Sequence, residues 1–82
     1  MGMDFIKRPL WTRKLSDEKL CKYLDEINEF ELRGGTDSEL LSYTVLTHYD
    51  NKVSVEQIKC LANDVYKEAS FRWYEKNACR FR

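Results

Sequence analysis

Apolar residues recur at helical spacing in three parts of the chain, and polar breaks separate the three parts. The first stripe consists of Leu20, Tyr23, Leu24, Ile27 and Phe30. Leu20, Leu24 and Ile27 follow the i, i+4, i+7 spacing of one helix face, and Tyr23 and Phe30 widen the stripe. Ser16 precedes the stripe as a suitable N-cap, and Gly34-Gly35 follows it as a typical helix stop. The pattern predicts an amphipathic helix over about residues 16–33.

A second helix is predicted over residues 37–49. Thr36-Asp37-Ser38-Glu39 has the T-x-x-E form of a capping box, and Leu41, Val45 and Tyr49 follow at intervals of four. The segment 43–47 is rich in β-branched and aromatic residues, which favours a strand. The capping box and the lack of a partner strand favour the helix instead.

The third predicted helix covers residues 55–79 and is the longest. Ser54 and Gln57 form an S-x-x-Q capping box, with Val53 and Ile58 placed as a hydrophobic staple around it. The predicted core face consists of Ile58, Leu61, Ala62, Val65, Ala69 and Trp73. Neither glycine nor proline interrupts this segment, so the helix is expected to run unbroken to its end.

Residues 1–15 are predicted to form an extended arm around Pro9, the only proline in the chain. The arm contains Trp11 and several aliphatic side chains, so we expect it to lie on the bundle or on a partner. The sequence therefore predicts an all-α fold, a small three-helix bundle of residues 16–82 preceded by this N-terminal arm. A chain of 82 residues has the size of one domain.

The charges balance to zero overall but are unevenly distributed. Residues 1–15 carry four basic residues and one acidic residue, residues 16–56 carry four basic and ten acidic, and residues 57–82 carry six basic and three acidic. Two basic ends thus flank an acidic middle. The segments can neutralise one another within the fold, or one end can face a partner of opposite charge.

Catalytic and metal-binding chemistry find little support in the residue pattern. His48 is the only histidine, and Cys21, Cys60 and Cys79 lie far apart, without the paired spacing of zinc domains. We therefore expect no enzyme activity, no cofactor and no metal, with the cysteines buried or half-buried in helices. The odd number of cysteines, with no apolar run of membrane-spanning length, favours free thiols in a reducing cytoplasm.

The C-terminal segment 71–82 concentrates four aromatic and four basic residues, which are the types enriched in interface hot spots. One helix face cannot bury all of these rings. The predicted partner-binding residues are Trp11, Arg72, Tyr74, Arg80 and Phe81. The acidic outer face of the first helix, formed by Asp25, Glu26 and Glu29, is a second candidate surface for a basic partner. The rings can instead be covered within the monomer by the arm.

The sequence favours a small non-enzymatic protein–protein interaction module, such as an inhibitor or adaptor of a larger protein. In its shortness and lack of motifs the chain is similar in style to phage and plasmid accessory proteins. One alternative is a nucleic-acid binder that uses the basic, aromatic ends. A helix-turn-helix is disfavoured, because no Lys or Arg lies between Asp37 and Asn51. Another alternative is an obligate homo-oligomer with rings buried between subunits.

Overall fold

The computed structural model describes residues 8–34 and 38–78, and in these residues it contains four α-helices and no strand. The helices are α1 (Leu10–Arg13), α2 (Asp17–Arg33), α3 (Glu39–His48) and α4 (Val55–Asn77). The predicted all-α bundle and its three main helices are thus confirmed. The segment 43–47, with its mixed helix and strand signals, lies inside α3.

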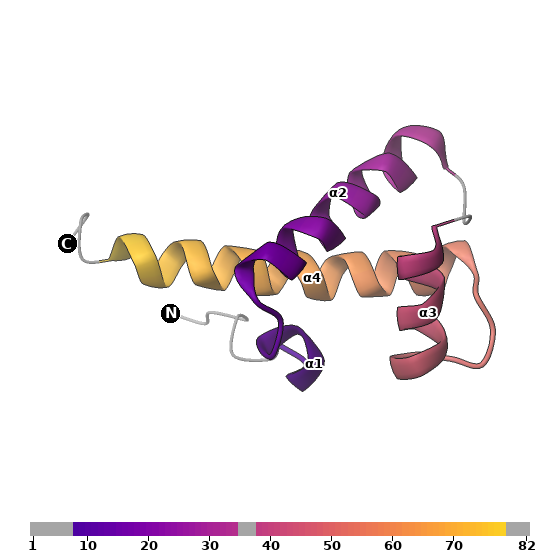
Figure 1. The fold of residues 1–82 in the computed structure, drawn as a ribbon, viewed down its shortest axis with the longest axis horizontal. Helices are drawn as coiled ribbons and strands as arrows, with labels where there is room; N and C mark the ends of the chain where they lie inside the picture. Colours follow the sequence, from indigo (N-terminus) through magenta and orange to yellow (C-terminus); the bar gives the residue numbers. More distant parts are fainter. Residues whose placement is uncertain (1–7, 35–37, 79–82) are drawn as a thin grey trace.

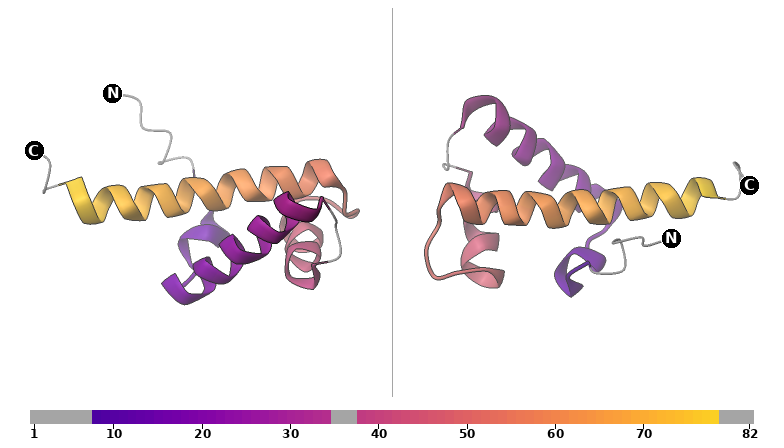
Figure 2. Two further views of the ribbon diagram at one scale, coloured as in Figure 1. Left: turned by 90° about the horizontal axis from the view of Figure 1, so that it is seen from above. Right: turned by 180° about the vertical axis from the view of Figure 1, so that it is seen from behind.

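The molecule has principal extents of 43 × 22 × 21 Å, and the long helix α4 lies along the longest axis. Helix α2 crosses it obliquely, and α3 stands across its N-terminal end (Figure 1). Seen from above, α1, α2 and α3 all lie on one side of α4 (Figure 2). The opposite side of α4 is therefore left uncovered by the other helices.

Serine hydroxyls cap the N-termini of the three main helices, as the orphan N–H groups of a first turn require. Ser16 accepts from the backbone N–H of Lys19, and Ser54 accepts from that of Gln57, both at 3.2 Å. At the other end of α2, Gly34 adopts φ +71° and donates its N–H to the carbonyl of Phe30. These two serines and the glycine stop agree with the sequence prediction.

The core lies where α2, α3 and α4 meet. Its fully buried aliphatic side chains are Ile27, Leu41, Val45, Ile58, Leu61 and Val65. A buried polar pair also crosses the core: Thr44 donates its hydroxyl to the carbonyl of Leu40, so the Tyr23 hydroxyl donates to Thr44 at 2.8 Å. Because this pair is fully hydrogen-bonded, its burial carries no desolvation penalty from unpaired groups.

The structure differs from the sequence prediction in the N-terminal arm and at the start of α3. The residues from Leu10 to Arg13 form the single turn α1, where an extended arm was expected. Thr12 stabilises this turn by donating its hydroxyl to the carbonyl of Pro9 at 2.7 Å. Helix α3 begins at Glu39, because Ser38, two residues beyond the predicted cap, accepts from the backbone N–H of Leu41.

The inward face of α4 also differs from the predicted one. Trp73 is 62% exposed, whereas Glu68 is 2% exposed. From Ile58 the buried stripe continues through Leu61 and Val65 to Glu68, with steps of three and four residues. The predicted core residue Ala69 does pack against the core, so the prediction is wrong only at Trp73. It omitted Glu68 because it followed apolar residues only, and a buried carboxylate needs partners that the pattern does not show.

Candidate interaction surfaces

Arg72 is the centre of a polar cluster that fastens the start of the chain to α4. Its guanidinium donates to Glu68 at 2.6 Å and to Asp17 at 2.8 Å. It also donates to the backbone carbonyls of Leu15 at 2.7 Å and Thr12 at 3.2 Å. Burial lowers the pKa of Arg72, but the hydrogen bonds and charges of Glu68 and Asp17 outweigh it, so the net shift is upward. The guanidinium therefore stays charged and acts as an internal clamp.

A second arginine completes the same cluster. Arg8 donates to the other carboxylate oxygen of Glu68 at 2.8 Å, and its guanidinium lies 3.5 Å from the ring centre of Phe71. The side chain of Glu68 is only 3% exposed, so one buried carboxylate is shared by two arginines. This arrangement satisfies the rule that a buried charge needs a paired, hydrogen-bonded partner.

The predicted primary surface is thus only partly brought together. Arg72 is engaged in the cluster, Tyr74 is half-buried on α4, and Trp11 packs towards α3 instead. Arg80 and Phe81 lie outside the described residues. A partner-binding role for these five residues stays a prediction. The hydrogen bonds of Arg72 are made within the protein, which favours a structural role for its side chain.

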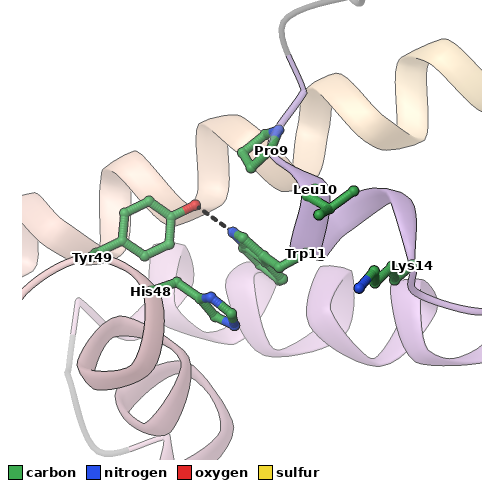
Figure 3. Close-up of a pocket in the computed structure, with 6 residues that line it drawn as sticks. All are labelled: Pro9, Leu10, Trp11, Lys14, His48 and Tyr49. Carbon is green, nitrogen blue, oxygen red and sulfur yellow. Dashed lines mark hydrogen bonds between the residues drawn. The ribbon is translucent and has the colours of Figure 1, made fainter.

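Trp11 lines an open pocket of about 430 Å³ between α1 and the end of α3 (Figure 3). The lining residues are Pro9, Leu10, Trp11, Lys14, His48 and Tyr49. The rings of Trp11 and His48 are stacked with centres 5.2 Å apart and planes 12° from parallel. Tyr49 meets the indole edge-on at 6.1 Å. The pocket therefore has an aromatic wall built from two elements far apart in the sequence.

A chain of hydrogen bonds fixes this wall. The indole N–H of Trp11 donates to the Tyr49 hydroxyl at 3.2 Å, and that hydroxyl donates to Asp64 of α4 at 2.5 Å. Burial, together with the hydrogen bond to Asp64, raises the pKa of Tyr49. The hydroxyl therefore keeps its proton and its donor role well into alkaline solution. By contrast, the side chains of Lys14 and His48 form no hydrogen bond or ion pair with any described residue.

A different kind of surface lies on the outer side of α3. Tyr43 is 70% and Leu46 53% exposed, although they belong to the same helix as the core residues Leu41 and Val45. Exposed acids stand near both ends of α3: Glu39 lies in its first turn, and Asp50, which accepts hydrogen bonds from Asn51 and Gln57, follows two residues after His48. This α3 outer face, defined by Tyr43, Leu46, Glu39 and Asp50, is apolar in the middle and acidic at its ends.

The predicted acidic face of α2 lies next to the start of α3. Asp25 and Glu29 are exposed, and Glu29 forms an ion pair with Arg33 at 3.1 Å. Glu26 is partly buried and accepts a hydrogen bond from the Ser38 hydroxyl at 2.7 Å, which joins α2 to the N-cap of α3. The negative charge of α2 therefore adjoins the acidic end of the α3 outer face.

The described residues contain no group of three potential metal ligands. Cys21 and Cys60 are free and exposed, so the expectation of buried cysteines is wrong for these two, and Cys79 lies outside the described residues. Both lie on the solvent sides of amphipathic helices, where a small thiol is tolerated. In the described part of the chain, no helix is both long and apolar enough to cross a lipid bilayer.

Sequence reasoning missed the pocket because its two walls come from residues nearly forty positions apart, and no local pattern links them. It also missed Tyr43 and Leu46, which the predicted helix places on a different side from Leu41 and Val45. A signal was available for these two, since the residues from Leu40 to Thr47 include no charged side chain on any face. A helix apolar on all sides is usually covered on all sides.

Comparison of the chain with protein-family models, with curated proteins and with solved structures finds no match.

Proposed function

We propose that this protein is a small non-enzymatic interaction module that binds a basic, amphipathic helical segment of a partner protein on the α3 outer face. The observation that carries the proposal is the exposure of Tyr43 and Leu46 in the middle of a helix without charged residues between its ends. Binding of this kind would make the protein an inhibitor or adaptor of the partner.

The apolar centre would supply the affinity. Within residues 8–34 and 38–78, the side of α3 that is buried is the one that carries Leu41, Thr44 and Val45. Tyrosine is among the residues most enriched in hot spots, because it buries a large ring with few rotatable bonds. Covering Tyr43 and Leu46 with the apolar stripe of a second helix is the helix-in-groove mode of recognition, with α3 and its neighbours forming the receiving surface.

The acids at the ends of the face would select the partner. Glu39, Asp50 and the neighbouring acids of α2 favour a segment with Lys or Arg on either side of its apolar stripe, since complementary charge steers association and suppresses wrong partners. The same acids oppose phosphate, so they argue against the nucleic-acid alternative at this surface. They also oppose a second copy, because antiparallel pairing through Tyr43 and Leu46 would bring Glu39 close to Asp50 of the copy.

The compartment we propose is the reducing cytoplasm. The two described cysteines are exposed and unpaired, which fits a setting where thiols stay reduced.

The test uses a fluorescently labelled model helix of leucine and lysine, with a leucine and glutamate helix of the same pattern as its charge-reversed counterpart. We expect anisotropy to show saturable binding of the lysine helix only. The Tyr43→Ala, Leu46→Ala double variant should bind it about tenfold more weakly, because two anchors are lost. Its thermal unfolding should be unchanged, since both side chains are exposed.

Leu32→Ala is the matched control, because Leu32 is an equally apolar residue, 74% exposed, at the end of α2. This variant should bind the lysine helix as the wild type does. Equal binding by the double variant, or equal binding of both model helices, would show that the α3 outer face does not carry recognition.

A further inference from the structure

We propose that the pocket between α1 and α3 is a binding site for a small organic carboxylate that carries an apolar ring. The site is separate from the α3 outer face and uses none of its residues. Three properties of the pocket support the proposal. Its wall is apolar and aromatic, a lysine side chain lies among its lining residues, and the polar groups behind the wall are already held by hydrogen bonds.

The wall is suited to a flat apolar group. Pro9, Leu10 and Trp11 form one side, and the His48 ring is stacked on the indole at a near-parallel angle. In Figure 3, Trp11 lies between His48 and Lys14, with Leu10 above it. Aromatic rings favour offset-stacked and edge-on contacts, and this wall offers both a ring face and aliphatic edges.

The charge of the lining selects the polar end of the ligand. Of the six lining residues one is a lysine, one is a histidine and none is acidic. The Lys14 ammonium has three donors, and no described residue accepts from them. A carboxylate next to Lys14 and the His48 imidazole would receive charge-assisted hydrogen bonds, whereas a cationic ligand would meet like charge.

The polar groups behind the wall are already satisfied. The Trp11 N–H is occupied by Tyr49, and the Tyr49 hydroxyl is occupied by Asp64. The carboxylate of Asp64 accepts from Tyr49 and is not among the lining residues. A ligand would need no rearrangement of this chain of hydrogen bonds, and a preorganised site loses less free energy on binding.

The size of the pocket matches a small ligand. Its volume of about 430 Å³ lies in the range of small-molecule sites, which runs from roughly 300 to 1,000 Å³. It is open on one side, so we expect a weak complex with a dissociation constant of about a millimolar for a single-ring acid. Phenylacetate is the probe, because it combines one ring with one carboxylate.

The experiment is a ¹⁵N NMR titration of the full chain with phenylacetate, phenylacetamide and acetate. The protein has two tryptophans, so the indole signal of Trp73 serves as an internal reference for that of Trp11. We expect phenylacetate to shift the Trp11 indole signal and the amides of residues 10–14, 48 and 49 in a saturable way. The neutral amide should bind about fivefold more weakly, since it lacks the charge that Lys14 pairs with.

Lys14→Gln tests the cation directly. It should weaken phenylacetate about threefold to fivefold and leave phenylacetamide unchanged. Lys19→Gln, which changes an exposed lysine of α2 that does not line the pocket, is the matched control and should leave both affinities unchanged. Because Lys14 is exposed and its side chain forms no hydrogen bond or ion pair with a described residue, its replacement should not alter folding.

Three results would overturn the proposal. The first is equal affinity for phenylacetate and phenylacetamide, which would leave the charge without a role. The second is equal affinity for phenylacetate and acetate, which would leave the ring without one. The third is tighter binding of the peptide Gly-Gly-Phe than of phenylacetate, which would assign the pocket to the end of a polypeptide chain.

Discussion

At the scale of single residues, Glu68 connects parts of the chain that are far apart in the sequence. It is buried on the inward face of α4, between Arg8 and Arg72, and it thereby joins the start of the chain to the long helix. The sequence shows both arginines and the acid, but no local pattern in it predicts that Arg8 contacts Glu68, sixty positions away. The burial of Glu68 on an otherwise apolar stripe is explained by its ion pairs with Arg8 and Arg72, which only the fold brings together.

Glu68→Gln should therefore be strongly destabilising. Among the described residues, the neutral amide leaves Arg8 without a counter-charge and leaves Arg72 with Asp17 alone, although the two arginine side chains are only 12% and 23% exposed. We expect a loss of about 2–3 kcal/mol in the free energy of unfolding, measured by urea denaturation. Glu75→Gln, at an exposed position of the same helix, should cost less than about 0.5 kcal/mol. Similar losses in the two variants would refute the shared-carboxylate role.

The raised pKa of Tyr49 predicts how the free energy of unfolding depends on pH. Its raised pKa means that the folded state keeps a proton that the unfolded state gives up above pH 10. The stabilisation is therefore complete below pH 10 and is lost as the pH rises further, by up to about 1.4 kcal/mol per pH unit. Tyr49→Phe removes this term, so its unfolding free energy should fall less steeply than that of the wild type above pH 10. Parallel pH profiles would contradict the hydrogen-bond chain.

At the scale of elements, the sequence predicts helices where their start and stop signals are local. Ser16, Ser54 and Gly34 act through groups within four residues, so the bounds of α2 and the start of α4 follow from the chain itself. The turn α1 has no such signal, because four residues carry no periodicity. Its turn is reinforced instead by contacts of Arg72 with the carbonyls of Thr12 and Leu15. At the start of α4, the side-chain amide of Gln57 donates to Asp50, whereas in a capping box it would bond to the backbone N–H of Ser54.

The stop of α2 can be tested at Gly34. A Cβ there would meet no atom within 4 Å, so the only cost of a side chain is the left-handed backbone conformation. Gly34→Ala should lower the unfolding free energy by about 1 kcal/mol. Gly34→Asn should cost less, since asparagine tolerates this conformation better than alanine does. The free energies of unfolding of the two variants are compared by thermal denaturation. An equal or larger loss for Gly34→Asn than for Gly34→Ala would show that backbone strain is not the cause.

At the scale of the whole molecule, the arrangement of the helices was beyond sequence reasoning. The stripes of α2 and α4 indicated that these helices pack, but not that α1, α2 and α3 share one side of α4. The pocket and the α3 outer face depend on that arrangement. Trp11 was identified as a candidate from its residue type, while its partners His48 and Tyr49 were not, because they reach it only through the fold.

The whole molecule should be a monomer. Self-association through the α3 outer face is opposed by its acids, so sedimentation equilibrium should give the chain mass of 9.9 kDa. The mass should stay the same when salt is lowered, since weaker screening strengthens the repulsion between acids. A mass of twice this value, restored to the single-chain value by Tyr43→Ala, Leu46→Ala, would instead show that the face is a subunit interface.

The clamp between the start of the chain and α4 has a consequence for how the molecule is made. During synthesis Arg8 and Leu15 leave the ribosome 60 and 57 residues ahead of Glu68 and Arg72, to which they are fastened. The α2–α3 pair can assemble earlier, because its contacts lie close together in the chain. The hydrogen-bonded wall of Trp11, Tyr49 and Asp64 needs only the first half of α4, so this pocket can be completed before the clamp at Glu68 and Arg72 closes.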